Sequence, residues 1–338
     1  MKILLVMDPG ISIPPPLYGG HERLVAMFAN EYYKLGHQVS LLAGPNSNIT
    51  GEVNYFGSNN LNRGKWHKFI ELLYAWYFLF RNRKNFDIIH NFGRLAYLIP
   101  ILNTKAAKLM TYGRAINPKG IKIISALPNK NLTYTACSNY CVSTGNVIGT
   151  WKTVYNAIDF SKYKLNLNVL DDAPLIFLGR LDKIKGVHTA IKVAKKTNKK
   201  LLIGGNISHT PDNLAYFNEL LKPQFDDKQI IYLGALNDED KNKYLRLAKA
   251  LLFPIEWDEP FGMVMVEAMA CGTPVIAFNK GAVPEIVVND LNGYRCDSIE
   301  QMIEYVSKID KIDRTQVRNY AETRFSSKLI AQQYLELK

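Results

Sequence analysis

Charged side chains in the second half of the chain could do chemistry. Glu259 and Glu267 are eight residues apart, the first in a polar loop and the second within an apolar, helix-like run. A lone carboxylate on a buried helix usually has a partner, because burying an unpaired charge is costly. Arg180 and Lys185 follow another apolar run and have glycines beside them. Two fixed cations with glycines that allow close approach suit a diphosphate group.

The elements around these residues must place them together. A strand at 251–254, a loop, a helix at 261–270 and a strand at 275–278 form a βαβ unit, and the strand at 175–178 leads into Gly179. Ligands of open α/β sheets bind at the loop ends of such units. A carboxylate such as Glu267 can accept two hydrogen bonds from the vicinal diol of a ribose. Cations for a diphosphate, one carboxylate for a ribose and another for further hydroxyls together favour a nucleotide sugar as the ligand.

The first half has the same alternation of strands and helices. A strand at 2–7, a loop with Gly19 and Gly20, a helix at 22–35 and a strand at 39–43 suit phosphate binding by backbone amides, although a glycine pair can equally be a simple turn. Two successive βα arrays of similar size predict an α/β protein with two Rossmann-like domains. The predicted domains are 1–165 and 166–315, and a C-terminal helix at 316–338 returns to the first domain.

Further elements are predicted from shorter patterns. Expected strands are 87–91, 122–127, 132–137, 200–203 and 230–233, and expected helices are 188–196, 214–221, 238–250, 299–309 and 318–336. His90 lies where the strand at 87–91 meets a loop. Such a histidine can face a ligand, but a structural histidine is the more common outcome.

The net charge of +12 fits three anionic partners: nucleic acid, a membrane surface or a nucleotide diphosphate. A solvated lysine-rich surface explains it as well. The aromatic stretch at 66–80 has basic residues on both sides, so it is either an interfacial helix on anionic lipid or a helix packed on the first sheet. With no secretory signal and no long apolar segment, we expect a cytoplasmic protein, with peripheral contact at the inner face of the membrane left open. The four cysteines make no metal pattern and suggest buried thiols.

Two motifs together resemble a known family. GRLDKIKGV (179–187) with EPFGMVMVEAMACGTPV (259–275) resembles the donor-site signature of family 4 retaining glycosyltransferases, which have the GT-B fold. YGGHERLV (18–25), GHQV (36–39), DIIH (87–90) and VYNAID (154–159) occur in the order of that family, so the resemblance spans almost the whole chain. It implies two Rossmann-like domains facing each other across a cleft, with C-terminal helices.

The resemblance also implies roles for single residues. Arg180 and Lys185 would bind the donor diphosphate, Glu259 would face the transferred sugar, and His90 would be the fourth catalytic residue. The implied donor-binding residues are Gly19, Gly20, Gly234, Phe261, Gly262, Met263, Val264 and Glu267. One position departs from the family: many members carry His-x-His after the DIIH-type strand, and here Phe92 replaces the second histidine. Either His90 or Asn91 takes a related role, or the acceptor side differs.

The implied activity is a retaining, metal-independent hexosyltransferase without a cofactor. Its donor would be a nucleotide diphosphate sugar such as a UDP-sugar, and its acceptor a carbohydrate or lipid-linked sugar in the synthesis of surface polysaccharide or another glycoconjugate. A GT-B epimerase or hydrolase acting on sugar nucleotides is the alternative within enzymes. A basic nucleic-acid-binding protein is the alternative from another class, although no nucleic-acid partner is expected.

Overall fold

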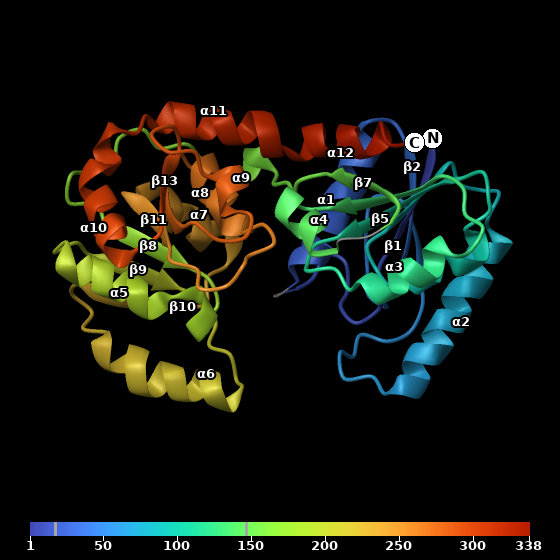
Figure 1. Ribbon diagram of the computed structural model, residues 1–338, viewed down its shortest axis with the longest axis horizontal. Coiled ribbons are helices and arrows are strands. Elements are labelled where there is room, and N and C mark those ends of the chain that lie inside the picture. The colour runs from blue at the N-terminus through green and yellow to red at the C-terminus, as the bar shows by residue number, and fades with distance from the viewer. Residues whose placement is uncertain (17–18, 146–147) are drawn as a thin grey trace. The chain divides into compact units, whose positions relative to one another are not determined.

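The computed structural model describes residues 1–16, 19–145 and 148–338, and these residues form two compact units. The first unit comprises Met1–Ala157 together with Ser327–Lys338, and the second comprises Ile158–Ser326. Each unit is a parallel β-sheet with helices on its faces (Figure 1). None of the helices in these three ranges is long and apolar enough to cross a membrane.

The sheet of the first unit has the strand order β3-β2-β1-β4-β5-β6-β7, and all its pairs are parallel. Residues 3–6 of the central strand β1 form a continuous, buried apolar run because helices cover both faces of the sheet. The strands are β1 (Lys2–Val6), β2 (Gln38–Ala43), β3 (Glu52–Tyr55), β4 (Ile88–Asn91), β5 (Ala107–Tyr112), β6 (Leu132–Ala136) and β7 (Thr150–Thr153). The helices are α1 (Gly20–Lys34), α2 (Lys65–Arg81), η1 (Leu95–Ile101), α3 (Pro118–Ser125), α4 (Asn139–Gly145) and, from the end of the chain, α12 (Ser327–Leu335), which packs on α1.

The sheet of the second unit has the order β10-β9-β8-β11-β12-β13, again entirely parallel. Its strands are β8 (Leu175–Leu178), β9 (Leu201–Gly204), β10 (Ile230–Gly234), β11 (Ala250–Phe253), β12 (Val275–Phe278) and β13 (Gly293–Cys296). Its helices are α5 (Val187–Lys196), α6 (Pro211–Ala215), α7 (Asp238–Leu247), α8 (Met263–Ala270), α9 (Val283–Ile286), α10 (Ile299–Lys308) and α11 (Arg314–Phe325), and its short helical turns are η2 (Phe160–Lys162), η3 (Lys183–Lys185), η4 (Tyr216–Leu221), η5 (Lys222–Gln224) and η6 (Ile309–Lys311).

Both sheets reverse their strand order once, between β1 and β4 in the first unit and between β8 and β11 in the second. The loops that leave the two strands on either side of such a reversal diverge to opposite faces, which opens a crevice at the carboxyl ends of the strands. In the second unit these loops carry Arg180 and Lys185 after β8 and Glu259 after β11. The fold therefore brings the predicted chemistry to one place.

Three predicted elements are wrong in type or extent. The segment 122–127 is the end of helix α3 and not a strand: Ile121 and Ile124 are buried at helical spacing, and the Asn117 side chain caps the helix start by accepting from the N–H of Lys119. Helix α7 ends at Leu247 because the following residues form strand β11. The single helix predicted at 318–336 is two helices, since the chain is extended at Ser326.

The boundaries of the two units differ from the domain boundaries that the sequence predicts. Residues 158–165 and helix α11 belong to the second unit, because Arg318 on α11 donates to the carbonyl groups of Phe160, Tyr163 and Ala270. Helix α12 belongs to the first unit, where the Tyr334 ring contacts Phe28 edge-on with a centroid distance of 5.2 Å.

Candidate functional site

The loop after β11 carries a compact charged group around Glu259. The Nζ atom of Lys185 lies 2.6 Å from Oε2 of Glu259, and the indole Nε1 of Trp257 donates to the same oxygen at 2.8 Å. The ammonium group also lies 5.2 Å from the centre of the Trp257 ring. Only 16% of each of the Lys185 and Glu259 side chains is exposed, so this ion pair is shielded from bulk water but reachable from it.

Two glycines let the backbone close around this group. Gly186 has φ +73°, and a Cβ there would lie 1.9 Å from the carbonyl oxygen of Pro254, so the loop after β8 packs directly against the end of β11. A Cβ on Gly281 would lie 2.4 Å from the backbone N and O of Glu259. A side chain at either position would push apart the segments that hold Lys185 against Glu259.

Glu267 belongs to a second charged group, which lies between helices α7 and α8. It is on α8, whose other inward residues are apolar, and its Oε1 lies 2.7 Å from Nζ of Lys241 on α7. The Tyr163 hydroxyl donates to the same carboxylate, and burial together with this carboxylate raises the pKa of Tyr163 well above its ordinary value. The carboxylate that the sequence predicts to need a partner therefore has two, a lysine and a tyrosine.

Arg180 differs from Lys185 because it is exposed. Its guanidinium lies 3.0 Å from Oδ2 of Asp182, which is itself buried. Oδ1 of Asp182 has no hydrogen-bond partner among the described residues. An exposed guanidinium anchored by one buried carboxylate at the end of β8 can turn toward an anion that enters the crevice.

The start of α8 supplies backbone donors. Gly262 precedes the helix with φ +85°, and Met263 and Val264 form its first turn. The first N–H groups of a helix have no partner within it and favour anions. Phe261 is in the core, where its ring contacts Phe325 edge-on, so only its backbone is available to a ligand. Gly234 ends β10 with φ +73°, and a Cβ there would meet nothing within 4 Å.

In the first unit, Gly19 immediately precedes α1, and a Cβ on Gly20 would meet open space. Both glycines lie in or beside the connection from β1 to α1. Tyr18 of the YGGHERLV motif lies outside the described residues.

His90, which was predicted as a catalytic residue, lies in the core of the first unit. His90 has no exposed surface, the Tyr32 hydroxyl is 3.0 Å from its Nδ1, and the Thr111 hydroxyl is 2.8 Å from its Nε2. Burial lowers the pKa of His90 from 6.5 to about 3, so the ring is neutral. The Phe92 ring stacks on it with a centroid distance of 4.1 Å. His90 is a satisfied core histidine.

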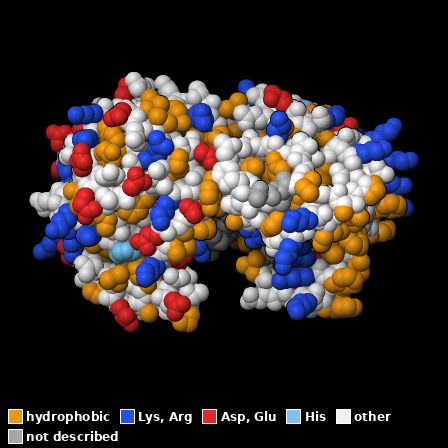
Figure 2. Space-filling view, in the orientation of Figure 1, with side chains coloured by type: hydrophobic (Ala, Val, Ile, Leu, Met, Phe, Trp, Pro, Cys, Tyr) orange, Lys and Arg blue, Asp and Glu red, His pale blue; other side chains and the backbone are white. Residues whose placement is uncertain are grey.

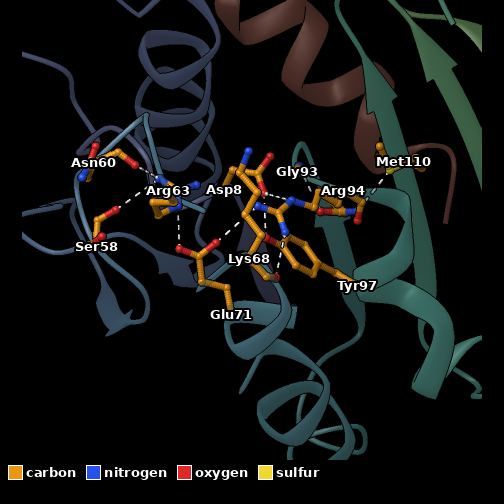
Figure 3. Close-up of polar contacts among 11 residues, drawn as sticks. Asp8, Ser58, Asn60, Arg63, Lys68, Glu71, Gly93, Arg94, Tyr97 and Met110 are labelled. Atoms are coloured by element: carbon orange, nitrogen blue, oxygen red, sulfur yellow. Dashed lines mark hydrogen bonds and ion pairs between the residues drawn. The ribbon is translucent and has the colours of Figure 1, made fainter. Parts of the chain in front are cut away.

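The polar group that does lie at this edge was not predicted from the sequence. The Tyr97 hydroxyl donates to Oδ1 of Asp8 at 2.6 Å, and Nε of Arg94 is 3.2 Å from the same oxygen (Figure 3). Arg94 also reaches Oε2 of Glu71 at 3.2 Å, and Arg63 reaches the other oxygen of Glu71 at 2.6 Å. Asp8 and Arg94 are partly exposed, whereas Glu71 is buried.

Three residues of the donor-side groups were also missed: Trp257, Lys241 and Tyr163. Trp257 could have been found, because it lies two residues before Glu259 in the same loop. Lys241 and Tyr163 come from α7 and from the segment after η2, and no local pattern connects them with Glu267.

Two parallel Rossmann-like sheets in one chain, with charged side chains at the carboxyl edge of the second, define the GT-B class of fold. The chain superposes over 99% of its length on a glycosyltransferase of avilamycin A biosynthesis, with a TM-score of 0.75 and 21% identity, covering 96% of that protein. It superposes equally completely on HepE of Anabaena, solved in complex with UDP and glucose, with a TM-score of 0.73 and 18% identity, covering 98% of that protein. These likenesses confirm the predicted fold class.

The family follows from the sequence of the second unit: residues 161–324 belong to the glycosyl transferases group 1. The chain is 30% identical to an uncharacterised glycosyltransferase of Methanocaldococcus jannaschii over 182 residues, which is 49% of this chain and 44% of that protein. It is 25% identical to the lipopolysaccharide 1,2-N-acetylglucosaminetransferase of Salmonella typhimurium over 87% of this chain and 84% of that protein. The chain thus spans about half the length of the first of these relatives. These matches bear out the predicted glycosyltransferase family.

Proposed function

We propose that this protein is a retaining glycosyltransferase that moves a hexose-type sugar from a UDP-sugar to a carbohydrate or lipid-linked acceptor. The observation that carries the proposal is the pair of charged groups at the carboxyl edge of the second sheet, Lys185 with Glu259 and Lys241 with Glu267. Each carboxylate is held by its own lysine, so the two can bind different parts of one donor.

In the reaction, the bond between the anomeric carbon of the sugar and the diphosphate oxygen breaks, the acceptor hydroxyl oxygen forms a new bond to that carbon, and the hydroxyl proton passes to the departing diphosphate. Negative charge then develops on the departing diphosphate. Arg180 and Lys185 are cations near the reversal of strand order between β8 and β11, and they can stabilise this charge. The first turn of α8 adds backbone donors. Glu259 binds sugar hydroxyls, and Glu267 binds the ribose diol.

Four further points of the proposal concern partners and conditions. UDP as the nucleotide is supported by the complexes of Anabaena HepE with UDP and with UDP-glucose, and a saccharide acceptor by the name of the Salmonella relative. We propose a reaction without a divalent metal, because cations and a helix start already supply positive charge at the crevice. The cytoplasm is the proposed compartment, since all four cysteines are buried thiols.

The test is a panel of nucleotide sugars scored by UDP release and by thermal shift. A ligand that binds the native state raises the melting temperature by mass action. One UDP-sugar is expected to stabilise the protein and to release UDP only with an acceptor present. Release without acceptor would indicate a hydrolase, and conversion of the sugar without release an epimerase. A panel that gives neither stabilisation nor release would overturn the proposal.

Site variants connect the activity with the crevice. Glu267→Ala is expected to raise the donor KM, and Lys185→Ala is expected chiefly to lower kcat. Lys192→Ala, on an exposed lysine of α5, is the matched control and is expected to keep wild-type kinetics. Wild-type donor kinetics in both site variants would place the donor elsewhere.

A further inference from the structure

Helix α2 of the first unit leaves an apolar face uncovered. Seven large side chains on it are exposed, with Trp66 at 70% and Tyr77 at 65%. They are Trp66, Phe69, Ile70, Leu73, Tyr74, Tyr77 and Phe80, and we call them the α2 stripe. Their spacing of three and four residues places them on one side of the helix. In Figure 2 hydrophobic side chains gather over the region where Figure 1 places α2.

The opposite side of α2 attaches it to the unit. Glu71, Ala75 and Leu79 are buried on that side. The indole of Trp76 donates to the carbonyl oxygen of Ala96 at 2.7 Å, and Arg94 donates to the carbonyl oxygen of Lys68 at 3.1 Å. The helix is therefore fixed by its inner side, and the outward direction of the stripe is set by the fold. An apolar stripe of this extent on a helix marks an interaction surface.

The charges beside the stripe are all of one sign. Lys65 and Lys68 are exposed at the start of the helix, and Arg81 and Lys84 are exposed at its end. The only acid between residues 56 and 86 is Glu71, which is buried and paired with Arg63 and Arg94. Any partner of the stripe must therefore accept aromatic and aliphatic side chains in its middle and provide anions at both ends.

We infer that α2 lies in the surface of an anionic lipid bilayer. A bilayer supplies an apolar layer for Ile70 and Leu73 and a headgroup layer in which tryptophan and tyrosine rings are stable. Its phosphate groups lie level with the basic ends of the helix. A second copy of the chain fits less well, because two stripes facing each other in a symmetric dimer would bring basic ends together. This inference is independent of the transferase proposal.

Sedimentation of the full chain with lipid vesicles tests the inference. We expect the protein to sediment with phosphatidylcholine vesicles that contain about 30% phosphatidylglycerol, to bind pure phosphatidylcholine much less, and to dissociate at about 0.5 M salt. Binding is also expected to shift the emission of Trp66 to shorter wavelength, and the variant Trp66→Phe should lose most of this shift. Trp76 is unsuitable for substitution because it is part of the attachment of α2.

Two double variants separate the apolar and the charged contribution. Ile70→Ser with Tyr77→Ser is expected to weaken vesicle binding at least tenfold. Lys65→Gln with Lys84→Gln is expected to weaken it about 25-fold, from about fivefold for each cation near the surface. The matched controls lie outside α2: Leu167→Ser with Leu170→Ser changes two exposed leucines, and Lys192→Gln with Lys196→Gln changes two exposed lysines of α5. Both controls are expected to bind like the wild type.

Circular dichroism melting verifies that each variant is folded, and UDP release in vesicle-free solution is expected to be the same for all of them. Three results would overturn the inference. The first is that the wild type stays in the supernatant with anionic vesicles. The second is that the double variant Ile70→Ser with Tyr77→Ser binds these vesicles like the wild type. The third is that light scattering shows a dimer of the wild type and a monomer of this double variant. None of these results would affect the proposed transferase activity, which the donor panel tests separately.

Discussion

Replacing Glu259 by glutamine is expected to tighten the binding of UDP while it slows sugar transfer. In the protein without ligand, Glu259 neutralises Lys185 at 2.6 Å. A diphosphate that binds Lys185 must therefore compete with the Glu259 carboxylate for the ammonium group. It is also repelled by the negative charge of that carboxylate. Glutamine keeps the shape of the side chain and an oxygen that can accept from Trp257, but it removes the negative charge.

The size of the effect follows from the burial of the pair. An exposed ion pair contributes about 0–1 kcal/mol, and breaking a fully buried one costs about 3–5 kcal/mol. With 16% of each side chain exposed, Lys185 and Glu259 lie between these limits. We therefore expect the binding free energy of UDP to be about 1.5–2 kcal/mol more favourable in the variant. This difference corresponds to roughly 10- to 30-fold tighter binding. UDP lacks the sugar that we propose Glu259 binds, so UDP is expected to lose no contact in return.

The assay is calorimetric titration of UDP into both proteins at low salt and at about 0.3 M salt, because screening should reduce the difference only modestly for a shielded pair. Glu304→Gln is the matched control: it removes the acid of an exposed Lys–Glu pair on α10 of the same unit. That control is expected to bind UDP like the wild type. Weaker or unchanged UDP binding by Glu259→Gln would refute the reasoning, since Lys185 would then not be shared between Glu259 and the diphosphate.

Three further predictions concern the groups around the site and the core. Tyr163→Phe removes a hydrogen bond to the Glu267 carboxylate, so donor KM should rise several-fold with little change in kcat, as steady-state kinetics will measure. The folded-state pKa of His90, about 3, lies below its unfolded value of 6.5, so its contribution to stability is present above pH 6.5 and is lost as the pH falls below it. This costs up to about 1.4 kcal/mol per pH unit, and the melting temperature of His90→Gln should depend less on pH in this range. Arg314→Met removes the donor to the carbonyl groups of Asn166 and Ala248, and urea unfolding should show a loss of about 3 kcal/mol.

The chemistry of the second unit could be predicted because its residues are local in the sequence. Gly179 to Lys185 directly follow β8 and Glu259 is in the loop after β11, and the carboxyl ends of parallel strands meet at one edge. What could not be predicted is which side chain pairs with which. That Lys185 meets Glu259 and Lys241 meets Glu267 depends on the β8, β10 and β11 order of the sheet, and the sequence leaves this order open.

Strand β5 and the segment 122–127 were not predicted correctly, and each has a physical reason. Strand β5 (Ala107–Tyr112) contains Lys108, and lysine is rarely buried. Here the Lys108 ammonium donates to the carbonyl oxygen of Thr104 at 2.9 Å, and burial lowers its pKa to about 8. The segment 122–127 has a short apolar run that fits a strand as well as a buried helix, and such runs cannot be assigned by periodicity alone.

The replacement of the second histidine by Phe92 changes what the first unit can offer to an acceptor. His90 is buried with both ring nitrogens bonded, and Phe92 covers it. Asn91 is buried too: its amide nitrogen donates to the carbonyl oxygen of Arg94, and its oxygen accepts from the N–H of Gly93. Neither residue can therefore replace the missing histidine. The partly exposed polar groups at the β1–β4 reversal are instead Asp8 and Arg94, joined to each other at 3.2 Å. If the acceptor binds at this edge, we expect its preference to depend on the Arg94–Asp8 pair, which kinetics of Arg94→Ala with a panel of acceptors would measure.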